Sequence, residues 1–330
     1  MLGMGETHEH MPAAGTIRPV VGRFAPTPSG RMHLGNVVAS LMAWAGARSA
    51  GGRMVMRIED LDPRAQDGTL ADQLMADLAW LGLDWDEGPY RQSERGQAYD
   101  AAIARLEELG LIYPCFCSRA ELHAATAPHA SDGSYVYAGT CRGLSAEEVA
   151  RRSAVRPPAL RLRVPDADDP ARMRRFHDLV LGECEEDLAA GCGDFLVRRS
   201  DGVTAYQLAV VVDDAEMGVS QVVRGRDLAG SVARQMYLQE LLGYGAPEYA
   251  HVPLLVAPDG RRLSKRERDL DLGALKERGV RPEQIIGKLA ACVGLADEDE
   301  QLTAVELVEC FSWEAVREHA GDIVVDGDFL

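Results

Sequence analysis

The feature that most constrains the fold is an alternation of apolar strands and helices in the first third of the chain. Val20–Phe24 is an apolar run that ends in a turn rich in proline and glycine, and the Ala-rich segment Val37–Arg48 then has helical character. Gly52–Ile58 and Thr69–Leu81 repeat the order of strand and helix. This succession is typical of a sheet covered by helices on both faces. The sequence therefore predicts an α/β fold with a doubly wound parallel sheet.

The rest of the chain divides into a different middle segment and a helical end. Leu111–Gly193 carries a cysteine cluster, a loop rich in Gly, Ser and Ala, and a proline-rich stretch, so we interpret it as an inserted subdomain. Other elements follow from apolar runs and periodicity. We expect strands at Asp194–Arg199, Ala205–Val212 and Gln221–Val223, and helices at Glu94–Leu109, Ser231–Leu242, Leu272–Arg278, Pro282–Val293 and Val305–Glu318.

Composition places the chain among ordinary globular proteins. Hydrophobic residues make up 46% and charged residues 26% of 330 positions, and no apolar run approaches the ~18 residues of a membrane span. Residues 1–16 lack both the basic and the apolar part of a signal peptide, so we interpret them as a disordered leader. We therefore expect a cytoplasmic protein with no membrane partner, and a monomer by default.

The charge distribution leaves the question of a nucleic-acid partner open. The net charge of −17 argues against one, but residues 297–330 hold eleven acidic residues and one Arg. The rest of the chain is therefore only mildly acidic. Its local basic groups are either a solvated charged face or a surface that contacts a nucleic acid. These groups include Arg161, Arg163, Arg172, Arg174 and Arg175.

The segment Arg23–Asn36 has the sequence expected of a phosphate-binding turn. A strand runs into a turn with prolines and Gly30 and then into a helix, which places a helix N-terminus where a phosphate can bind. His33 precedes the helix and could donate a hydrogen bond to a phosphate oxygen. Gly35 would allow close approach of a ligand. A simple helix-capping role for His33 is the alternative.

A second candidate segment is Arg261–Arg266, which follows a turn at Pro258–Gly260. A loop that carries Lys265 and flanking cations could stabilise the charge that develops on a triphosphate when pyrophosphate leaves. In isolation such a loop is as easily a solvated surface loop.

Together the two segments resemble the HIGH and KMSKS signatures of class I aminoacyl-tRNA synthetases. Asn36 stands where the first signature ends in His, and Arg262 stands where the second begins with Lys. Further blocks resemble the glutamyl and glutaminyl branch of that family, in the same order along the chain. These blocks are Arg23–Gly30, Arg57–Arg64, Asp194–Arg199, Tyr206–Asp214 and Val222–Leu228.

This resemblance implies an amino-acid site, an ATP site and a division into domains. Residues 17–110 and 194–256 would form a Rossmann-like catalytic domain and residues 111–193 an inserted subdomain that binds the acceptor end and zinc. Residues 257–330 would hold the second signature and a short C-terminal helical region, without an anticodon-binding domain. His33, Gly35, Asn36 and Lys265 would contact ATP with its magnesium ion, and His33, Asn36 and Lys265 would be catalytic.

Free glutamate requires cations for two carboxylates and an acceptor for its ammonium group. Arg23 and Arg224 are candidates for the carboxylates, and Glu59 is a candidate for the ammonium. An internal ion pair beside a core tyrosine is the alternative interpretation of these residues. By resemblance the glutamate pocket comprises Arg23, Phe24, Ala25, Pro26, Thr27, Glu59, Tyr206 and Arg224.

The cysteines Cys115, Cys117 and Cys141 are clustered, and in a cytoplasmic protein such clusters favour a metal over disulfides. Three thiolates need a fourth ligand to close a structural zinc site, and His123 and His129 are candidates. Buried free thiols are the other interpretation. Resemblance to a truncated subgroup of the glutamyl branch implies Tyr137 as the fourth ligand.

Within this family the chain resembles the truncated glutamyl-queuosine tRNA(Asp) synthetases. They share the C-x-C and Y-x-x-x-C pattern, and only about 64 residues follow Arg266 here. The resemblance implies formation of glutamyl-AMP from L-glutamate and ATP without tRNA, and then transfer of glutamate to the queuosine base of tRNA(Asp). A short glutamyl-tRNA synthetase that charges a tRNA 3′ end, and a non-catalytic paralogue that binds glutamate or ATP, are the alternatives.

Overall fold

A computed structural model describes residues 19–118, 121, 136–261, 271–325 and 329–330. Its first sheet is parallel and has the strand order β1-β2-β3. The strands β1 (Val21–Phe24) and β2 (Arg53–Ile58) match the predicted strands, whereas β3 (Glu87–Arg91) was not predicted. β3 escaped prediction because its sequence EGPYR is polar, contains glycine and proline, and lies largely exposed at the edge of the sheet.

The second sheet has the order β7-β6-β10-β9, and its strands β6, β10 and β9 are parallel. It lies beside the first sheet, because the Val21 N–H donates to the Ser220 hydroxyl (2.9 Å) and the Ser220 N–H donates to the Val21 carbonyl (2.9 Å). The predicted α/β architecture with a parallel sheet is confirmed. The strands are β9 (Gln221–Gly225), β10 (Glu248–Val252), β6 (Met173–Asp178) and β7 (Gly182–Asp187).

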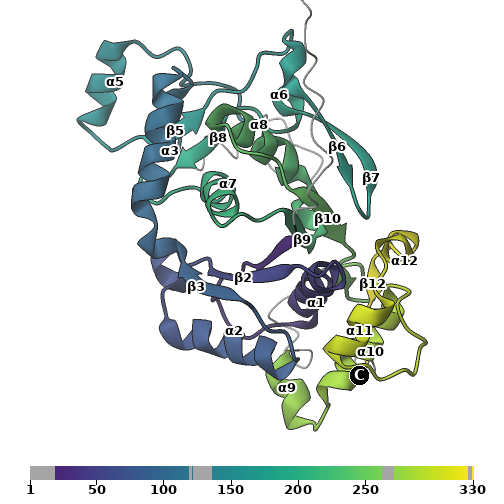
Figure 1. Cartoon of the computed structure of the whole chain (residues 1–330). Helices are drawn as coiled ribbons and strands as arrows, with labels where there is room; N and C mark the ends of the chain where they lie inside the picture. Colours follow the sequence, from purple (N-terminus) through teal and green to yellow (C-terminus); the bar gives the residue numbers. More distant parts are fainter. Residues whose placement is uncertain (1–18, 119–120, 122–135, 262–270, 326–328) are drawn as a thin grey trace, which may run out of the picture.

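Two helices pack directly against the first sheet (Figure 1). The helix α1 (Leu34–Ser49) is buried along most of its length, which agrees with its run of alanine, valine and leucine. The helix α2 (Gly68–Trp80) begins after Asp67, whose carboxylate accepts a hydrogen bond from the Thr69 N–H at 2.9 Å. Both helices confirm the predicted alternation within a few residues of their expected ends.

A third, antiparallel sheet has the order β4-β5-β8 and lies in the upper part of Figure 1. It joins the predicted insertion to the strand that follows it, because β5 (Ala159–Leu162) pairs with β8 (Phe195–Arg198). The hairpin β6–β7, also within residues 111–193, pairs instead with β10 of the second sheet. The remaining strand of this sheet is β4 (Ile112–Cys115). Around the sheet lie the helices α3 (Gly96–Glu108), α5 (Ala146–Ser153), α6 (Leu188–Gly191) and α8 (Val232–Leu242).

The segment Ala205–Val212 is a helix, and its prediction as a strand was wrong. It forms most of α7 (Tyr206–Glu216), which is buried continuously from Leu208 to Asp214. A valine-rich run that is buried on nearly all sides has no polar face, so the helical period is absent from the sequence. Consequently, Tyr206 lies in the first turn of a helix and not within a strand.

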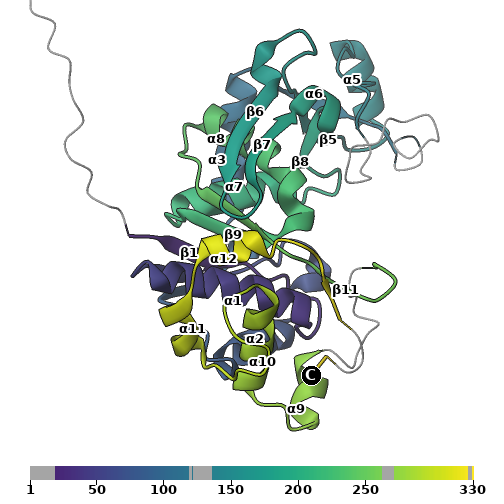
Figure 2. The ribbon, with the colours of Figure 1, turned by 90° about the vertical axis from the view of Figure 1, so that its right-hand side faces the viewer.

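The acidic C-terminal region packs against α1 and the first sheet. Leu302, Leu307 and Val316 belong to the same apolar cluster as the buried face of α1, and β12 (Ile323–Val324) pairs with β11 (Leu255–Val256). The helix predicted at Val305–Glu318 is interrupted by an extended residue at Phe311. The helices of this region, shown in green to yellow in Figure 2, are α9 (Leu272–Glu277), α10 (Pro282–Cys292), α11 (Ala304–Cys310) and α12 (Trp313–Glu318).

Among the described residues, no helix is both long and apolar enough to cross a membrane.

Candidate active site

A pocket of about 520 Å³ lies where β1, β2 and β9 end. In a parallel sheet the carboxyl ends of the strands and the first turns of the following helices meet at one edge, which is where α/β proteins bind ligands. Lys265 lies outside the described residues. Every other residue that the sequence assigned to glutamate or ATP lines this pocket: Arg23, Phe24, Ala25, Pro26, Thr27, His33, Gly35, Asn36, Glu59, Tyr206 and Arg224.

The N-terminus of α1 faces one side of this pocket. His33 is the residue before the helix, in extended conformation, and its side chain makes no capping hydrogen bond to the helix. His33 thus occupies the N-cap position through its backbone carbonyl, which accepts hydrogen bonds from the N–H groups of Asn36 (2.9 Å) and Val37 (3.2 Å), and its imidazole is not used as a cap. A Cβ at Gly35 would lie 3.0 Å from two atoms of the His33 ring, so glycine leaves the imidazole its space. The partial positive charge of a helix N-terminus favours an anion here.

The loop before α1 also contacts the chain beyond the second signature. His33 forms an isolated antiparallel bridge with Asp271, and the Leu272 N–H donates to the Met32 carbonyl at 3.0 Å. Residues 262–270 lie outside the described part of the chain. The chain that follows the second signature thus returns to the loop before α1, although the two segments lie far apart in the sequence.

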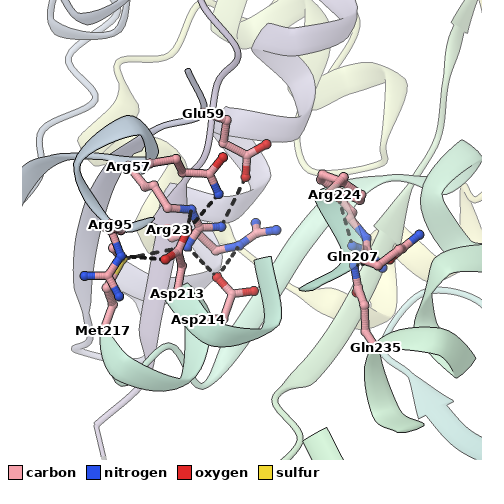
Figure 3. A network of polar contacts seen from close by, with 12 residues as sticks. Arg23, Arg57, Glu59, Arg95, Gln207, Asp213, Asp214, Met217, Arg224 and Gln235 are labelled. Atoms are coloured by element: carbon pink, nitrogen blue, oxygen red, sulfur yellow. Dashed lines mark hydrogen bonds and ion pairs between the residues drawn. The ribbon is translucent and has the colours of Figure 1, made fainter. Parts of the chain in front are cut away.

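A cluster of buried charges forms the floor of the site (Figure 3). The Arg57 guanidinium, fully buried, donates to Asp214 at 2.7 Å and to Glu59 at 3.3 Å. Arg23 lies 3.7 Å from Asp214 and donates to the Val223 carbonyl at 2.8 Å, so it bridges β1 and β9. Each cation of this cluster has an acidic neighbour. The ion pairs and hydrogen bonds therefore offset the desolvation free energy that burial of these charges costs.

Asp213 is the second acidic centre of this cluster. It is fully buried and accepts hydrogen bonds from Gln92 (2.7 Å), Arg95 (2.6 Å) and the Tyr99 hydroxyl (3.0 Å). Arg57 Nε lies 3.7 Å from the same carboxylate. Gln92, Arg95 and Tyr99 lie at or just before the start of α3, and Arg57 lies on β2, so Asp213 ties α7 to α3 and β2.

Glu59 is an acidic group that lines the pocket, and its side chain is 11% exposed. Burial raises the pKa of the Glu59 carboxyl above its usual range, although Arg57 and Arg23 oppose that shift. A carboxylate in this position can accept hydrogen bonds from an ammonium group that enters the pocket. The internal ion pair considered as an alternative does exist with Arg57, yet Glu59 also lines the pocket.

Arg224 is held from behind by a buried histidine. Its Nε donates to His251 Nε2 at 3.0 Å, and His251 Nδ1 lies 2.6 Å from Asp178. Tyr206, in the first turn of α7, places its hydroxyl 3.5 Å from Arg224 Nη1. Arg224 Nη2 is buried and has no hydrogen-bond partner among the described residues. The guanidinium therefore retains an unsatisfied donor at the pocket, as a site for an anionic ligand requires.

The predicted metal ligands form a compact group outside the pocket. The sulfur atoms of Cys115, Cys117 and Cys141 lie within 4.8 Å of one another, and the Tyr137 hydroxyl lies 3.5 Å and 3.6 Å from the first two. Tetrahedral zinc with sulfur ligands at about 2.3 Å keeps its ligands about 3.8 Å apart, so the four atoms fit such an ion. His123 and His129 lie outside the described residues.

The sequence predicted no role for several polar residues of the site. Arg57 and Asp213 stand inside apolar segments, and a charge in such a segment is the available signal. His251 and Asp178 carry no comparable signal, because they contribute only through contacts formed across the second sheet.

Comparison with known proteins identifies the family. Residues 19–325 match the family model described as tRNA synthetases class I (E and Q), catalytic domain. A glutamyl-Q tRNA(Asp) synthetase of Symbiobacterium thermophilum is 49% identical over 88% of this chain and 91% of that protein. One of Nitratidesulfovibrio vulgaris is 48% identical over 83% of this chain and 86% of that protein.

Among solved structures, a glutamate tRNA ligase of Elizabethkingia meningosepticum in complex with its amino acid aligns with a TM-score of 0.79. It is 26% identical, and the alignment covers 94% of this chain and 68% of that chain. The chain therefore belongs to the class I tRNA synthetases of the E and Q type, and within that family to the group of the glutamyl-Q tRNA(Asp) synthetases.

Proposed function

We propose that this protein activates L-glutamate with ATP and transfers the glutamyl group to the queuosine base of tRNA(Asp). The observation that carries this proposal is the pocket itself. It places the buried cations Arg23 and Arg224 and the carboxylate Glu59 around one cavity of about 520 Å³. Two cations and one anion match the two carboxylates and the ammonium group of glutamate.

ATP would bind on the side of the pocket that the α1 N-terminus faces. His33, Gly35 and Asn36 line that side, and we assign them to the triphosphate together with Lys265 and a magnesium ion. Magnesium would neutralise phosphate charge when bound. The helix N-terminus and the imidazole of His33 would orient the phosphates toward the amino acid.

In the first step, an oxygen of the glutamate α-carboxylate attacks the α-phosphorus of ATP, pyrophosphate leaves, and glutamyl-AMP forms. This reaction needs orientation and stabilisation of charge and no nucleophile from the protein. Arg23, Glu59 and Arg224 hold the amino acid, while His33 and Lys265 balance the charge that develops on the leaving pyrophosphate. We propose that this step proceeds without tRNA.

In the second step, a hydroxyl of the cyclopentenediol of queuosine attacks the carbonyl carbon of glutamyl-AMP, and AMP leaves. The relatives named glutamyl-Q tRNA(Asp) synthetases support this acceptor, because they are 48–50% identical to this chain over most of its length. Charging of a tRNA 3′ end is the second candidate, which the likeness to a glutamate tRNA ligase structure favours.

We also propose one zinc ion held by Cys115, Cys117, Tyr137 and Cys141, with a structural role. It would fix the end of β4 within the subdomain at residues 111–193, which we assign to the acceptor tRNA. We assign residues 17–110 and 194–256 to catalysis and residues 257–330 to the second signature and its supporting helices. A protein that acts on tRNA is expected in the cytoplasm, and we expect a monomer.

Transfer of radiolabelled glutamate to two tRNA pools tests the proposal, one pool from cells that make queuosine and one from cells that do not. Label in the first pool alone supports queuosine as the acceptor. Removal of the 3′-terminal adenosine should then leave the labelling intact. Equal label in both pools, lost with that adenosine, would establish 3′ charging instead. Glu59→Gln, whose site for the substrate ammonium is weakened, should label either pool poorly at a limiting glutamate concentration.

Pyrophosphate exchange without tRNA tests the first step separately. Glutamate-dependent exchange of pyrophosphate into ATP is expected in the absence of any tRNA. If neither exchange nor labelling occurs, the protein only binds its ligands and the proposal is wrong.

A further inference from the structure

Behind the pocket, Arg224 is joined by hydrogen bonds to His251 and Asp178, two buried side chains to which the proposed chemistry gives no role. Arg224 Nε lies 3.0 Å from His251 Nε2, and His251 Nδ1 lies 2.6 Å from Asp178 Oδ2. His251 and Asp178 are fully buried, and Arg224 is 5% exposed. They come from three adjacent parallel strands, β9, β10 and β6.

The protonation of this chain follows from the donor capacity of arginine. A guanidinium has only donors, so His251 Nε2 must accept the hydrogen bond from Arg224. The single proton of the neutral imidazole then lies on Nδ1 and is donated to Asp178. Burial lowers the pKa of His251, and the charge of Arg224 adds to that shift, so the neutral ring is the stable form.

Asp178 can impose this arrangement because it is itself fixed. Its Oδ1 accepts hydrogen bonds from the backbone N–H groups of Val180 and Leu181, both at 2.9 Å, and of His251 at 3.2 Å. The second oxygen is therefore aimed at the ring. Tyr249 stacks on the His251 ring with centroids 6.2 Å apart, which fixes its plane.

We propose that Asp178 and His251 are positioning residues for the amino acid. His251 occupies the Nε of Arg224, which leaves the two terminal nitrogens of the guanidinium, of which Nη1 lies 3.5 Å from the Tyr206 hydroxyl. One of these, Nη2, is the buried donor without a partner among the described residues. This inference rests on the proposed function, because it assigns Arg224 to a substrate carboxylate. It adds that Asp178 selects the tautomer of His251 that makes Arg224 available.

Asp178→Asn is the sharpest test, because it preserves shape and the acceptor for the three backbone donors. The new amide would donate to His251 Nδ1, and the ring proton would move to Nε2, where it opposes the Arg224 N–H. Loss of a hydrogen bond to a charged group predicts a rise of about tenfold or more in the KM for glutamate. The KM for ATP should stay within about twofold of the wild type.

A matched pair of substitutions separates positioning from simple packing. In His251→Gln the side-chain oxygen reaches toward the place of Nε2 and can still accept from Arg224. In His251→Asn the shorter amide reaches only the place of Nδ1. We expect His251→Gln to keep a glutamate KM at least severalfold lower than His251→Asn. His177→Asn on β6, at an exposed histidine, and Asp299→Asn, at an exposed aspartate, are the controls and should leave both KM values unchanged.

Nitrogen NMR of the imidazole provides a readout that needs no substrate. The wild type should show the Nδ1–H tautomer of His251, and Asp178→Asn should show the Nε2–H tautomer. The inference is overturned if the tautomer does not change, if the KM values for glutamate and ATP rise together, or if both histidine variants behave alike. A wild type without glutamate-dependent pyrophosphate exchange would reject the proposed function instead, and the tautomer measurement would still decide the hydrogen-bond chain.

Discussion

At the scale of single residues, the site depends on charges that water does not fully solvate. Glu59 combines an ion pair with Arg57 and a place in the pocket wall, and burial raises the pKa of its carboxyl. A carboxyl with a raised pKa takes up its proton at a higher pH than a free glutamate side chain. As the pH is lowered, Glu59 therefore loses its negative charge, and with it its attraction for an ammonium group, at a higher pH than the side-chain carboxylate of free glutamate loses its charge.

The KM for glutamate should rise as the pH is lowered from neutrality toward the range in which a free glutamate side chain titrates. The raised pKa of Glu59 means that its carboxyl takes up a proton before that range is reached and no longer balances the substrate ammonium. The KM for ATP should change much less over this range. Glu59→Gln should have a high KM for glutamate at every pH and no such dependence. Pyrophosphate-exchange kinetics measure both constants, and a flat glutamate profile for the wild type would contradict this role of Glu59.

Gly35→Ala should raise the KM for ATP by about fivefold. The added methyl would lie 3.0 Å from the His33 ring, and relief of a tight contact of this kind costs about 1 kcal/mol. The matched control is Gly68→Ala at the start of α2, where nothing lies within 4 Å of the new methyl group. A larger effect on the KM for glutamate than on the KM for ATP would contradict the assignment of His33 to ATP.

At the scale of elements, the cysteine cluster joins the end of β4 to residues 137–141. The Cys141 N–H donates to the Tyr137 hydroxyl at 2.8 Å. Arg161 of β5 donates to the Cys115 sulfur at 3.3 Å, and its guanidinium lies 3.7 Å from the Tyr137 ring centroid. A cation beside a thiol stabilises its thiolate form, which is the form that binds zinc, and the hydrogen bond from Arg161 helps to lower the pKa of Cys115.

Cys141→Ser should lower the zinc content of the purified protein from about one ion per chain to well below one. Its melting temperature should fall, because the metal no longer links the cluster residues. Cys192→Ser, at a buried cysteine outside the cluster, should retain the ion. Metal analysis by mass spectrometry measures the content, and an equal zinc content in both variants would exclude this cluster as the site.

At the scale of the whole molecule, the C-terminal helices complete the core on which the pocket rests. A Cβ at Gly46 of α1 would lie 2.6 Å from the Trp313 ring, so α1 and α12 are in close contact. Arg226, which follows the strand of Arg224, pairs with Asp322 at 2.6 Å. The strongly acidic end of the chain is thus a structural part of the catalytic unit, with its charges on the outer surface.

Leu307→Ala in α11 should reduce the free energy of unfolding by about 2–5 kcal/mol, because it empties a fully buried position of the core. Val305→Ala, on the same helix but 65% exposed, should change it by less than about 0.5 kcal/mol. Denaturant unfolding measures both values. Equal stability of the two variants would mean that α11 does not support the core in solution.

The sequence by itself determined the features that depend on local pattern or on chemically distinctive residue types. The strands and helices around Arg23 and His33 and the cysteine cluster were predictable in this way, because apolar periodicity, turn residues and clustered thiols act over short segments. The assignment of the site to glutamate and ATP came from the resemblance of several segments to the synthetase family, because the spacing of residues alone does not identify these ligands.

Only the tertiary structure decided the features whose partners lie far apart in the chain. The valine-rich run of α7 became a helix because the protein surrounds it on most sides, and the sequence holds no trace of that environment. Arg57 meets Asp214 across 157 positions, and Asp178 meets His251 across 73. A buried charge gains its partner only when strands and helices pack against each other. The role of such a residue therefore depends on the tertiary structure and cannot be predicted from its spacing in the sequence.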